Sequence, residues 1–194
     1  MTTLVDLERE ARSCVVCPLS ATRTTVVFGV GAPSARLMLV GEAPGRDEDL
    51  VGEPFVGRSG QLIQRLVSEE IGLSRDECYI ANVVKCRPPA NRDPVPDEVA
   101  ACRHFLDDQV RLVGPDVVVT LGNFATRALL GTAEGVTKLR GRAYPFGSAS
   151  LVPTFHPAAA LRGGGVVVAQ IRADLVRAKG LLARSAGGPR SDRA

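Results

Sequence analysis

The sequence predicts an α/β protein in which a parallel β-sheet is covered by helices on both faces. Short apolar runs typical of buried strands alternate with longer segments of helical periodicity, and this order is typical of parallel sheets. The composition agrees with this fold class: 45% of the 194 residues are hydrophobic, but only 4% are aromatic and none is Trp. Such a chain is long enough to bury a sizeable aliphatic core as one domain.

The first part of the chain contains one helix and the first strand of the sheet. Residues 3–13 place apolar side chains on one face at helical spacing. Residues 22–31 are less regular, but their Thr and Val content favours a short strand. Residues 35–40 form the first apolar run, which predicts the opening strand of the sheet.

The middle of the chain supplies the next helix, strand and helix. Ser59 is the expected N-cap of a helix that continues to Ile71 and is closed by Gly72. The second strand covers residues 79–84. A helix over residues 96–112 begins with a proline and carries acidic residues in its first turn, where they interact well with the helix dipole.

The remaining elements continue the alternation. They are a strand at 116–121, a helix at 123–130, a basic loop at 132–142, a strand at 151–155 and a helix at 166–183. We expect a single domain over residues 1–183. Residues 184–194 are expected to form a flexible basic tail, since Arg, Gly and Ser dominate there.

The charge and hydropathy patterns limit the partners and the location of the protein. The formal net charge is only +3, so any affinity for nucleic acid would have to come from a local basic face. No signal peptide is visible. No apolar run approaches the roughly 20 residues that cross a bilayer. We therefore expect a cytoplasmic protein that makes no membrane contact.

Four of the five cysteines form a candidate ligand set. In a cytosolic protein of this size, a metal or redox site explains cysteines better than a disulfide framework does. Cys14 and Cys17 share a C-x-x-C turn, whereas Cys86 and Cys102 are far away in sequence. Cys78 lies in an apolar stretch and is expected to pack as a small hydrophobe. Four thiolates suit zinc or a [4Fe–4S] cluster, and the lack of a second tight pair modestly favours the cluster.

Three polar residues follow the predicted strands at their carboxyl ends. Glu42 lies in a turn over residues 41–45 whose glycines leave backbone amides exposed, Asn82 ends the second strand, and His156 follows the last one. The carboxyl ends of parallel strands share one edge of a sheet, so these side chains can converge on a ligand site. Taken singly, each has a simpler explanation: a solvated carboxylate, an amide that caps a turn, and a loop histidine.

Several motifs in order resemble those of the iron–sulfur uracil-DNA glycosylases, the family-four branch of that superfamily. These motifs are Gly41-Glu42-Ala43-Pro44-Gly45, Pro54-Phe55-Val56-Gly57, Asn82-Val83-Val84-Lys85-Cys86-Arg87-Pro88 and Phe155-His156-Pro157-Ala158. Each motif alone would be weak evidence, but their order makes the resemblance specific. It extends from Cys14 to about Arg177.

The resemblance implies a fold and a cofactor. The fold is a three-layer αβα arrangement with a short, mainly parallel, four-stranded central sheet. The cofactor is a [4Fe–4S] cluster held by Cys14, Cys17, Cys86 and Cys102. Its implied role is structural, namely to fix loops that face DNA.

The resemblance also implies how the base would be bound. A base inside a duplex must be extruded before a pocket can hold it. Phe55 would stack on the extruded base, and Asn82 would accept from uracil N3–H and donate to O4, a polarity that cytosine does not match. Glu48 resembles the position that would exclude the methyl group of thymine. Phe55 could instead be a core residue, and Glu48 could be solvated with its acidic neighbours.

The implied chemistry is cleavage of a glycosidic bond. His156 would hydrogen-bond uracil O2 as negative charge develops, and the amides of the turn that contains Gly41 and Ala43 would add donors. Glu42 would position or deprotonate the attacking water. The better-known branch of the superfamily has an aspartate in this turn, where this sequence has Ala43.

Basic and hydroxyl side chains would contact DNA phosphates without sequence preference. The candidates are Arg58, Ser59, Lys138, Arg140, Arg142 and Arg162. Each could equally be an ordinary solvated residue. Leu161 is the candidate to fill the space that the extruded base leaves.

The sequence thus predicts a monofunctional uracil-DNA glycosylase that acts as a monomer on single- or double-stranded DNA containing uracil. Lys85 is a poor candidate for a Schiff-base lyase step. A related branch binds uracil-DNA covalently through a histidine in a basic insertion, which this sequence lacks. The alternative from another class is a non-catalytic four-cysteine metal module that binds DNA or a nucleotide.

Overall fold

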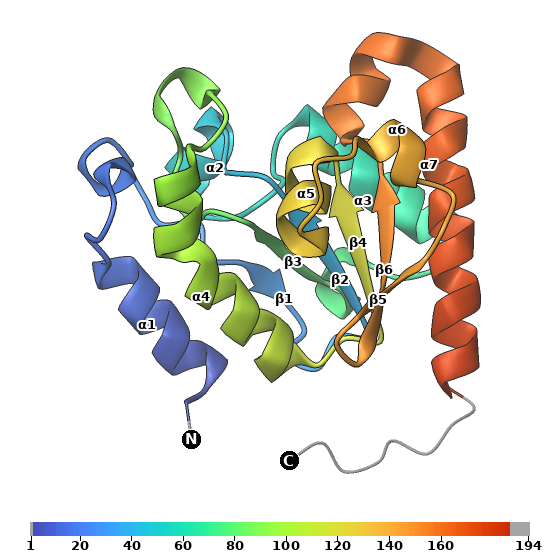
Figure 1. Cartoon of the computed structure of the whole chain (residues 1–194), viewed down its shortest axis with the longest axis horizontal. Coiled ribbons are helices and arrows are strands. Elements are labelled where there is room, and N and C mark those ends of the chain that lie inside the picture. Colours follow the sequence, from blue (N-terminus) through green and yellow to red (C-terminus); the bar gives the residue numbers. More distant parts are fainter. Residues whose placement is uncertain (1, 187–194) are drawn as a thin grey trace.

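The structure, a computed structural model, describes residues 2–186 and consists of a six-stranded sheet between two layers of helices (Figure 1). The strand order is β1-β3-β2-β4-β6-β5. The strands are β1 Val30–Gly31, β2 Leu37–Gly41, β3 Tyr79–Asn82, β4 Val117–Leu121, β5 Tyr144–Phe146 and β6 Ala149–Thr154. The α/β class and the layered arrangement are as predicted.

The prediction of a four-stranded sheet was wrong. The four predicted strands are present as the parallel core β3-β2-β4-β6, but β1 and β5 add an antiparallel strand at each edge, so the sheet is only partly parallel. These edge strands contain two and three residues and are not fully buried. Such short segments leave no apolar periodicity in the sequence. Only the last two residues of the predicted 22–31 segment pair as a strand.

The helices lie on the two faces of the sheet. The α-helices are α1 Leu4–Ser13, α2 Arg46–Val51, α3 Arg58–Ile71, α4 Pro96–Val113, α5 Asn123–Leu130, α6 Val136–Leu139 and α7 Pro157–Ala186; three short 3₁₀ helices are η1 Pro18–Ala21, η2 Arg75–Glu77 and η3 Pro89–Asn91. Helices α1, α4 and α5 cover one face, while α3 and α7 cover the other.

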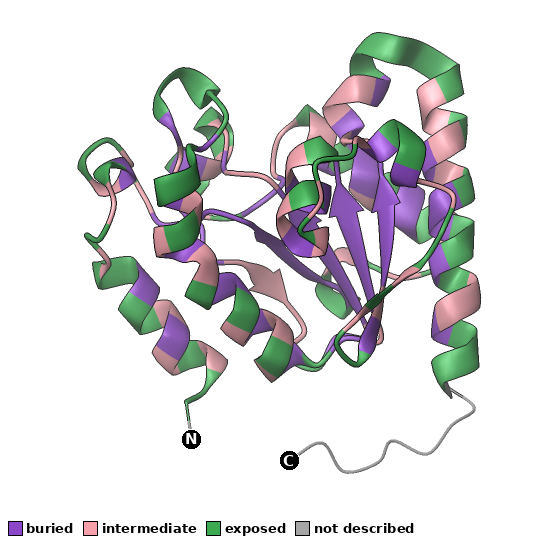
Figure 2. Ribbon diagram, in the orientation of Figure 1, coloured by how far each residue is buried: buried purple, intermediate pink, exposed green. Residues whose placement is uncertain are grey.

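Two hydrophobic clusters, one on each face of the sheet, make up the core. Strand β2 illustrates the alternation, since Met38 and Val40 pack toward α4 while Leu37 and Leu39 pack toward α3 and α7. All five of its residues are buried, as expected for a central parallel strand. The four central strands are accordingly buried at every residue except Ser150 (Figure 2). Within the described residues, no helix is both long and apolar enough to cross a membrane.

Several boundaries differ from the predicted ones. Helix α3 begins at Arg58 with Gly57 as its N-cap, so Ser59 lies inside the helix and does not cap it. Helix α7 begins at Pro157 and is interrupted at Gly164, where φ is 67°. Residues 184–186 of the expected tail continue α7, and the rest of that tail lies outside the described residues.

The topology brings the carboxyl ends of the parallel strands to one edge. Gly41 of β2 is paired with Asn82 of β3, and the amide of Val83 donates to the carbonyl of Gly41 at 2.9 Å. His156 follows β6 and reaches across the end of β4. A Cβ atom added at Gly122 would lie only 3.0 Å from His156 Cβ, so the glycine leaves room for this crossing.

Candidate active site

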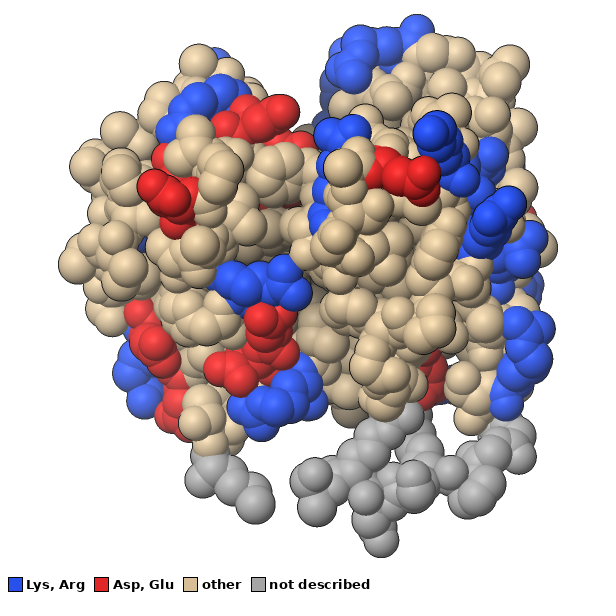
Figure 3. Space-filling model, in the orientation of Figure 1, with Lys and Arg blue, Asp and Glu red and all other residues tan. Residues whose placement is uncertain are grey.

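A cleft of about 520 Å³ lies at this edge of the sheet. Many of the predicted site residues line it together: Glu42, Ala43, Glu48, Phe55, Ser59, Asn82, His156 and Arg162. Figure 3 shows the same end of the molecule hollowed between two raised parts, with acidic and basic side chains along its margins. The structure therefore brings together the residues that the separate motifs contribute.

Glu42 is the carboxylic acid at the end of β2. Burial, together with the negative charge of Asp93 and a hydrogen bond to it, raises the pKa of Glu42 to about 7. Asp93 belongs to the loop before α4 and lines the same cleft. At neutral pH, Glu42 is therefore divided between its protonated and ionised forms, a range that suits proton transfer.

Glu48 connects the two turns that border the cleft. One carboxylate oxygen accepts from the amide of Gly45 at 3.2 Å, and the other accepts from the amides of Val56 and Gly57 at 3.1 and 3.2 Å. The acidic segment that contains it folds as the short helix α2. Glu48 is thus not a freely solvated charge, because it holds both turns in register.

Phe55 is buried beside the cleft in a constrained backbone conformation. Its φ of 55° lies in the left-handed region, which is unfavourable for a bulky residue. Helix α3 supports this conformation, since Gln64 Nε2 donates to the Phe55 carbonyl at 2.9 Å. A Cβ atom at Gly60 would lie only 1.8 Å from that carbonyl oxygen, so only glycine permits the close approach. The Phe55 ring lies 6.0 Å from the His156 ring, centroid to centroid.

Asn82 presents an unpaired acceptor at the cleft. The residue is only 2% exposed, and its Oδ1 atom has no hydrogen-bond partner within the described residues. Gly41 makes room for it, because an added Cβ atom would lie 2.5 Å from Asn82 Oδ1 and 2.6 Å from Phe55 Cζ. A buried amide oxygen without a partner is costly, and a ligand donor would remove that cost.

His156 is a neutral hydrogen-bond donor to the cleft. Burial, together with the charge of Arg162, lowers the pKa of His156 to about 4. Its Nδ1 atom accepts from the amide of Ala158 at 3.2 Å. In a neutral imidazole the other nitrogen then carries the proton, so Nε2–H is the available donor.

The predicted phosphate-binding residues occupy different surroundings. Ser59 and Arg162 line the cleft, whereas Arg58 lines a neighbouring groove with Arg65 and Leu161. Arg140 lies elsewhere: its guanidinium bonds both carboxylate oxygens of the buried Asp174 at 3.0 and 3.1 Å. Arg142 and Lys138 do not line the cleft either, and Lys138 is exposed.

Four of the five cysteines line one small cavity between α1, the loop after β3, and α4. They are Cys14, Cys17, Cys86 and Cys102, and Arg23 and Lys85 line the same cavity. Cys78 lies apart, and burial raises the pKa of its thiol to about 12. This separation matches the predicted division into four candidate ligands and one core residue.

The spacing of these thiols bears on which metal they suit. Within residues 2–186, no three His, Cys, Asp or Glu side chains gather closely enough to hold a single ion. A zinc site needs its sulfurs about 2.3 Å from one ion, whereas a [4Fe–4S] cluster takes each thiolate on a different iron. Four thiolates that line one cavity are a donor set that a [4Fe–4S] cluster takes.

One cationic side chain and one backbone amide donate to these sulfur atoms. Arg23 Nη1 donates to Cys86 Sγ at 3.3 Å and to the Cys14 carbonyl at 2.8 Å. The backbone amide of Lys85 donates to Cys102 Sγ at 3.3 Å. Burial lowers the pKa of the Lys85 ammonium to about 8, and the nearby Cys102 and Cys86 oppose that shift.

Sequence reasoning missed the part of the cleft formed by the loop before α4. Asn91, Arg92 and Asp93 line the cleft. Arg92 is held by Glu98, whose carboxylate oxygens it contacts at 2.9 and 2.7 Å. The prolines of this loop indicated only that it is irregular, and no motif showed that it folds back over Glu42.

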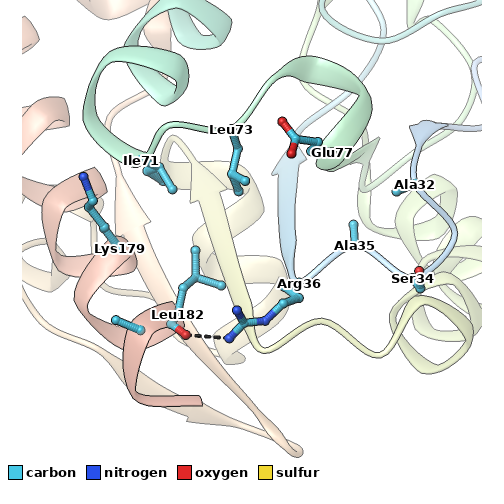
Figure 4. Close-up of a pocket in the computed structure, with 10 residues that line it drawn as sticks. Ala32, Ser34, Ala35, Arg36, Ile71, Leu73, Glu77, Lys179 and Leu182 are labelled. Carbon is cyan, nitrogen blue, oxygen red and sulfur yellow. Dashed lines mark hydrogen bonds between the residues drawn. The ribbon is translucent and has the colours of Figure 1, made fainter. Parts of the chain in front are cut away.

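A second cavity, of about 470 Å³, lies at the opposite end of the sheet and contains none of the predicted site residues (Figure 4). Leu73, Ile71 and Leu182 give it an apolar wall, and Arg36 donates to the carbonyl of Leu182. It lies on the side where β2 begins, away from the cleft.

Comparison with known proteins identifies the family. Residues 28–175 match the model of the uracil DNA glycosylase superfamily. A type-4 uracil-DNA glycosylase from Thermotoga maritima is 46% identical over 158 residues, which are 80% of this chain and 82% of that protein. One from Sulfurisphaera tokodaii is 44% identical over 169 residues, 83% and 77% of the two chains. A type-5 enzyme from Thermus thermophilus is 33% identical over 150 residues, 67% and 68% of the two chains. The chain therefore belongs to the uracil DNA glycosylase superfamily, and within it to the type-4 uracil-DNA glycosylases.

Proposed function

We propose that this protein is a monofunctional uracil-DNA glycosylase that hydrolyses the N-glycosidic bond of deoxyuridine in DNA. It releases uracil and leaves an abasic site for base-excision repair. Its family membership supports the activity. The observation that carries the site assignment is the buried, unpaired Oδ1 of Asn82 in the same cleft as the neutral His156.

Asn82 and Phe55 bind the extruded base in this proposal. The Asn82 amide accepts from uracil N3–H and donates to O4, while cytosine would leave both groups unpaired. The ring of Phe55 stacks on the base, an interaction worth about 1–3 kcal/mol. Glu48 braces both turns around the base and excludes the methyl group of thymine. Its three amide partners support a fixed position for that carboxylate.

His156 stabilises the leaving group. As the C1′–N1 bond breaks, the bonding electrons pass to uracil, and negative charge develops on O2. The Nε2–H of a neutral His156 donates to O2, and the backbone amides of the turn that includes Gly41 and Ala43 add fixed dipoles. The low pKa of His156 supports this role, because a neutral imidazole donates a hydrogen bond without placing a positive charge in the cleft when no base is bound.

Glu42 activates the attacking water. The carboxylate accepts a proton from water as the water oxygen bonds to C1′, and the departing uracil anion is later protonated by solvent. The carboxylate also favours the positive charge that develops on the sugar. Lys85 does not line the cleft, which agrees with a hydrolytic mechanism that needs no Schiff base.

We further propose that Cys14, Cys17, Cys86 and Cys102 hold a [4Fe–4S] cluster. The cluster would supply a structural crosslink between the N-terminal segment, the loop after β3, and α4. The position of all four cysteines on one cavity supports this assignment.

The DNA backbone would lie along the margin of the cleft. Arg162 and Ser59 are the phosphate contacts that the cleft favours, with Arg58 in the adjoining groove and Leu161 as the candidate wedge. Arg140 would have to leave Asp174 to serve this role, and Arg142 would act outside the cleft. We expect a monomer to be sufficient, since one chain supplies all the proposed groups.

The test uses oligonucleotides with one uracil, single-stranded or paired with G or A, scored for alkali-labile abasic sites. We expect cleavage by the unmodified protein and at least about a hundredfold loss in Asn82→Ala and His156→Ala. The matched control is Gln170→Ala, an amide side chain on α7 that does not line the cleft. Uracil release that persists in both variants would refute the site assignment, and no release by the unmodified protein would refute the activity.

A further inference from the structure

Lys85 is among the largest fully buried side chains of the described core, and the proposed mechanism does not use it. It is only 1% exposed, and no carboxylate forms an ion pair with it anywhere in residues 2–186. An ammonium group buried without an anion is strongly disfavoured. The fold must therefore supply a negative partner of another kind.

The Lys85 ammonium has two neutral acceptors in fixed positions. Its Nζ atom donates to the carbonyl of Asn82 at 2.7 Å and to Gln109 Oε1 at 2.5 Å. Gln109 is itself oriented, because its Nε2 donates to the Phe28 carbonyl at 2.8 Å and to the Tyr79 hydroxyl at 3.2 Å. These bonds set the direction of the Lys85 side chain, but they supply no negative charge.

The four-cysteine cavity is the candidate for this negative partner. Lys85 lines the four-cysteine cavity, and its backbone amide donates to Cys102 Sγ. Four thiolates that hold an iron–sulfur cluster would make this cavity anionic. Charge and hydrogen bonds around the sulfurs are among the factors that tune an iron–sulfur site.

Asn82 contacts the same ammonium group. Its carbonyl accepts from the Lys85 ammonium, while its side chain faces the cleft with Oδ1 unpaired. The ammonium therefore fixes, from behind, the backbone of the residue proposed to bind uracil. Among the described residues, Lys85 Nζ makes no hydrogen bond to any other residue of the cleft.

We propose that Lys85 is the counter-ion of the four-cysteine site and a positioning residue for Asn82, so that it couples that site to uracil binding. The proposal rests on the proposed site. It assigns no chemical step to Lys85. Arg23 is a second cation at the sulfurs, but it is partly exposed and does not contact Asn82.

The test compares Lys85→Met and Lys85→Gln, which remove the charge, with Lys85→Arg, which keeps it. Lys179→Met, an exposed lysine on α7, is the matched control. The first measurement is the rate at which iron-loaded protein loses its visible absorbance to a chelator. We expect an acceleration of about tenfold or more in both neutral variants and none in the control.

The second measurement is uracil release in two backgrounds. We expect Lys85→Met to lower kcat/KM about tenfold or more in the unmodified protein, but to cause little further loss when Asn82 is already alanine, since coupled residues are not additive. Affinity for DNA without uracil should not change. Equal losses in both backgrounds, or wild-type rates of both iron loss and uracil release, would overturn the proposal.

Whether the Lys85 variants fold is a further test of the proposal. If both neutral variants fail to fold while Lys85→Arg folds, the requirement for charge is supported; if Lys85→Arg fails as well, the proposal is overturned. These outcomes are distinct from a failure of the proposed function, which would appear in the unmodified protein as absent uracil release or absent visible absorbance.

Discussion

The carboxyl group of Glu42 titrates near neutrality because two causes act in the same direction. Burial disfavours its charged form, and the negative charge of Asp93 disfavours it again. His156, in contrast, is held neutral down to about pH 4. The two residues proposed to act on the substrate therefore titrate in separate pH ranges, which lets their contributions be measured separately.

We predict an acidic limb in kcat near pH 7, with activity rising as Glu42 loses its proton. Asp93→Asn removes the repelling charge, so the pKa of Glu42 should fall and the limb should move to lower pH, by up to about one unit. The check is a pH profile of single-turnover uracil release from pH 5 to 9. Asp76→Asn, an exposed aspartate away from the cleft, is the control. A limb that does not move in Asp93→Asn would contradict the proposed coupling.

At the scale of elements, the four central strands could be predicted because each is a mainly apolar run that is almost completely buried. The edge strands could not, since β5 has only three residues, pairs through a turn and is not fully buried. The sequence after Gly45 shows that this segment is acidic. It does not show that the Glu48 carboxylate accepts hydrogen bonds from three backbone amides. That arrangement depends on two turns meeting in space, which spacing along the chain does not encode.

The same limit applies to the candidate site. Glu42, Asn82 and His156 follow strands, so topology alone brought them to one edge. Asp93 follows no strand and arrives through a loop that the Arg92–Glu98 ion pair closes. Lys85 was visible in its motif, but its burial and its bond to the Asn82 carbonyl required the packing of α4.

Glu48→Gln tests whether the two turns depend on one side chain. The amide retains one acceptor oxygen, so it cannot satisfy all three donors, and its NH₂ group would face an amide donor. We predict a loss of about 1–3 kcal/mol in the free energy of unfolding and a lower kcat, measured by denaturant titration and single-turnover kinetics. Glu53→Gln, in the same segment but paired only at the surface with Arg75, should cost far less. Equal losses of unfolding free energy in the two variants would show that the Glu48 carboxylate is not needed to hold the two turns together.

At the scale of the whole molecule, the cysteines join parts that the sheet does not. Helix α1 and the segment that carries Cys14 and Cys17 lie outside the parallel core, against α4 (Figure 1). The loop after β3 carries Cys86, and α4 carries Cys102. A cofactor on these four residues would tie the N-terminal segment to the loop that follows the proposed uracil-binding residue.

This arrangement predicts a difference between two single-cysteine variants. Cys14→Ser should lose most of the visible absorbance and iron content and should lower the melting temperature by several degrees, because a ligand of the crosslink is removed. Cys78→Ala removes a buried thiol that packs apart from the cavity, so it should keep its iron and lose only packing stability. The measurements are iron analysis, an absorbance spectrum and a melting curve for each variant. Equal iron contents in the two variants would refute the ligand assignment, whereas zinc in place of iron would retain the site and change its metal.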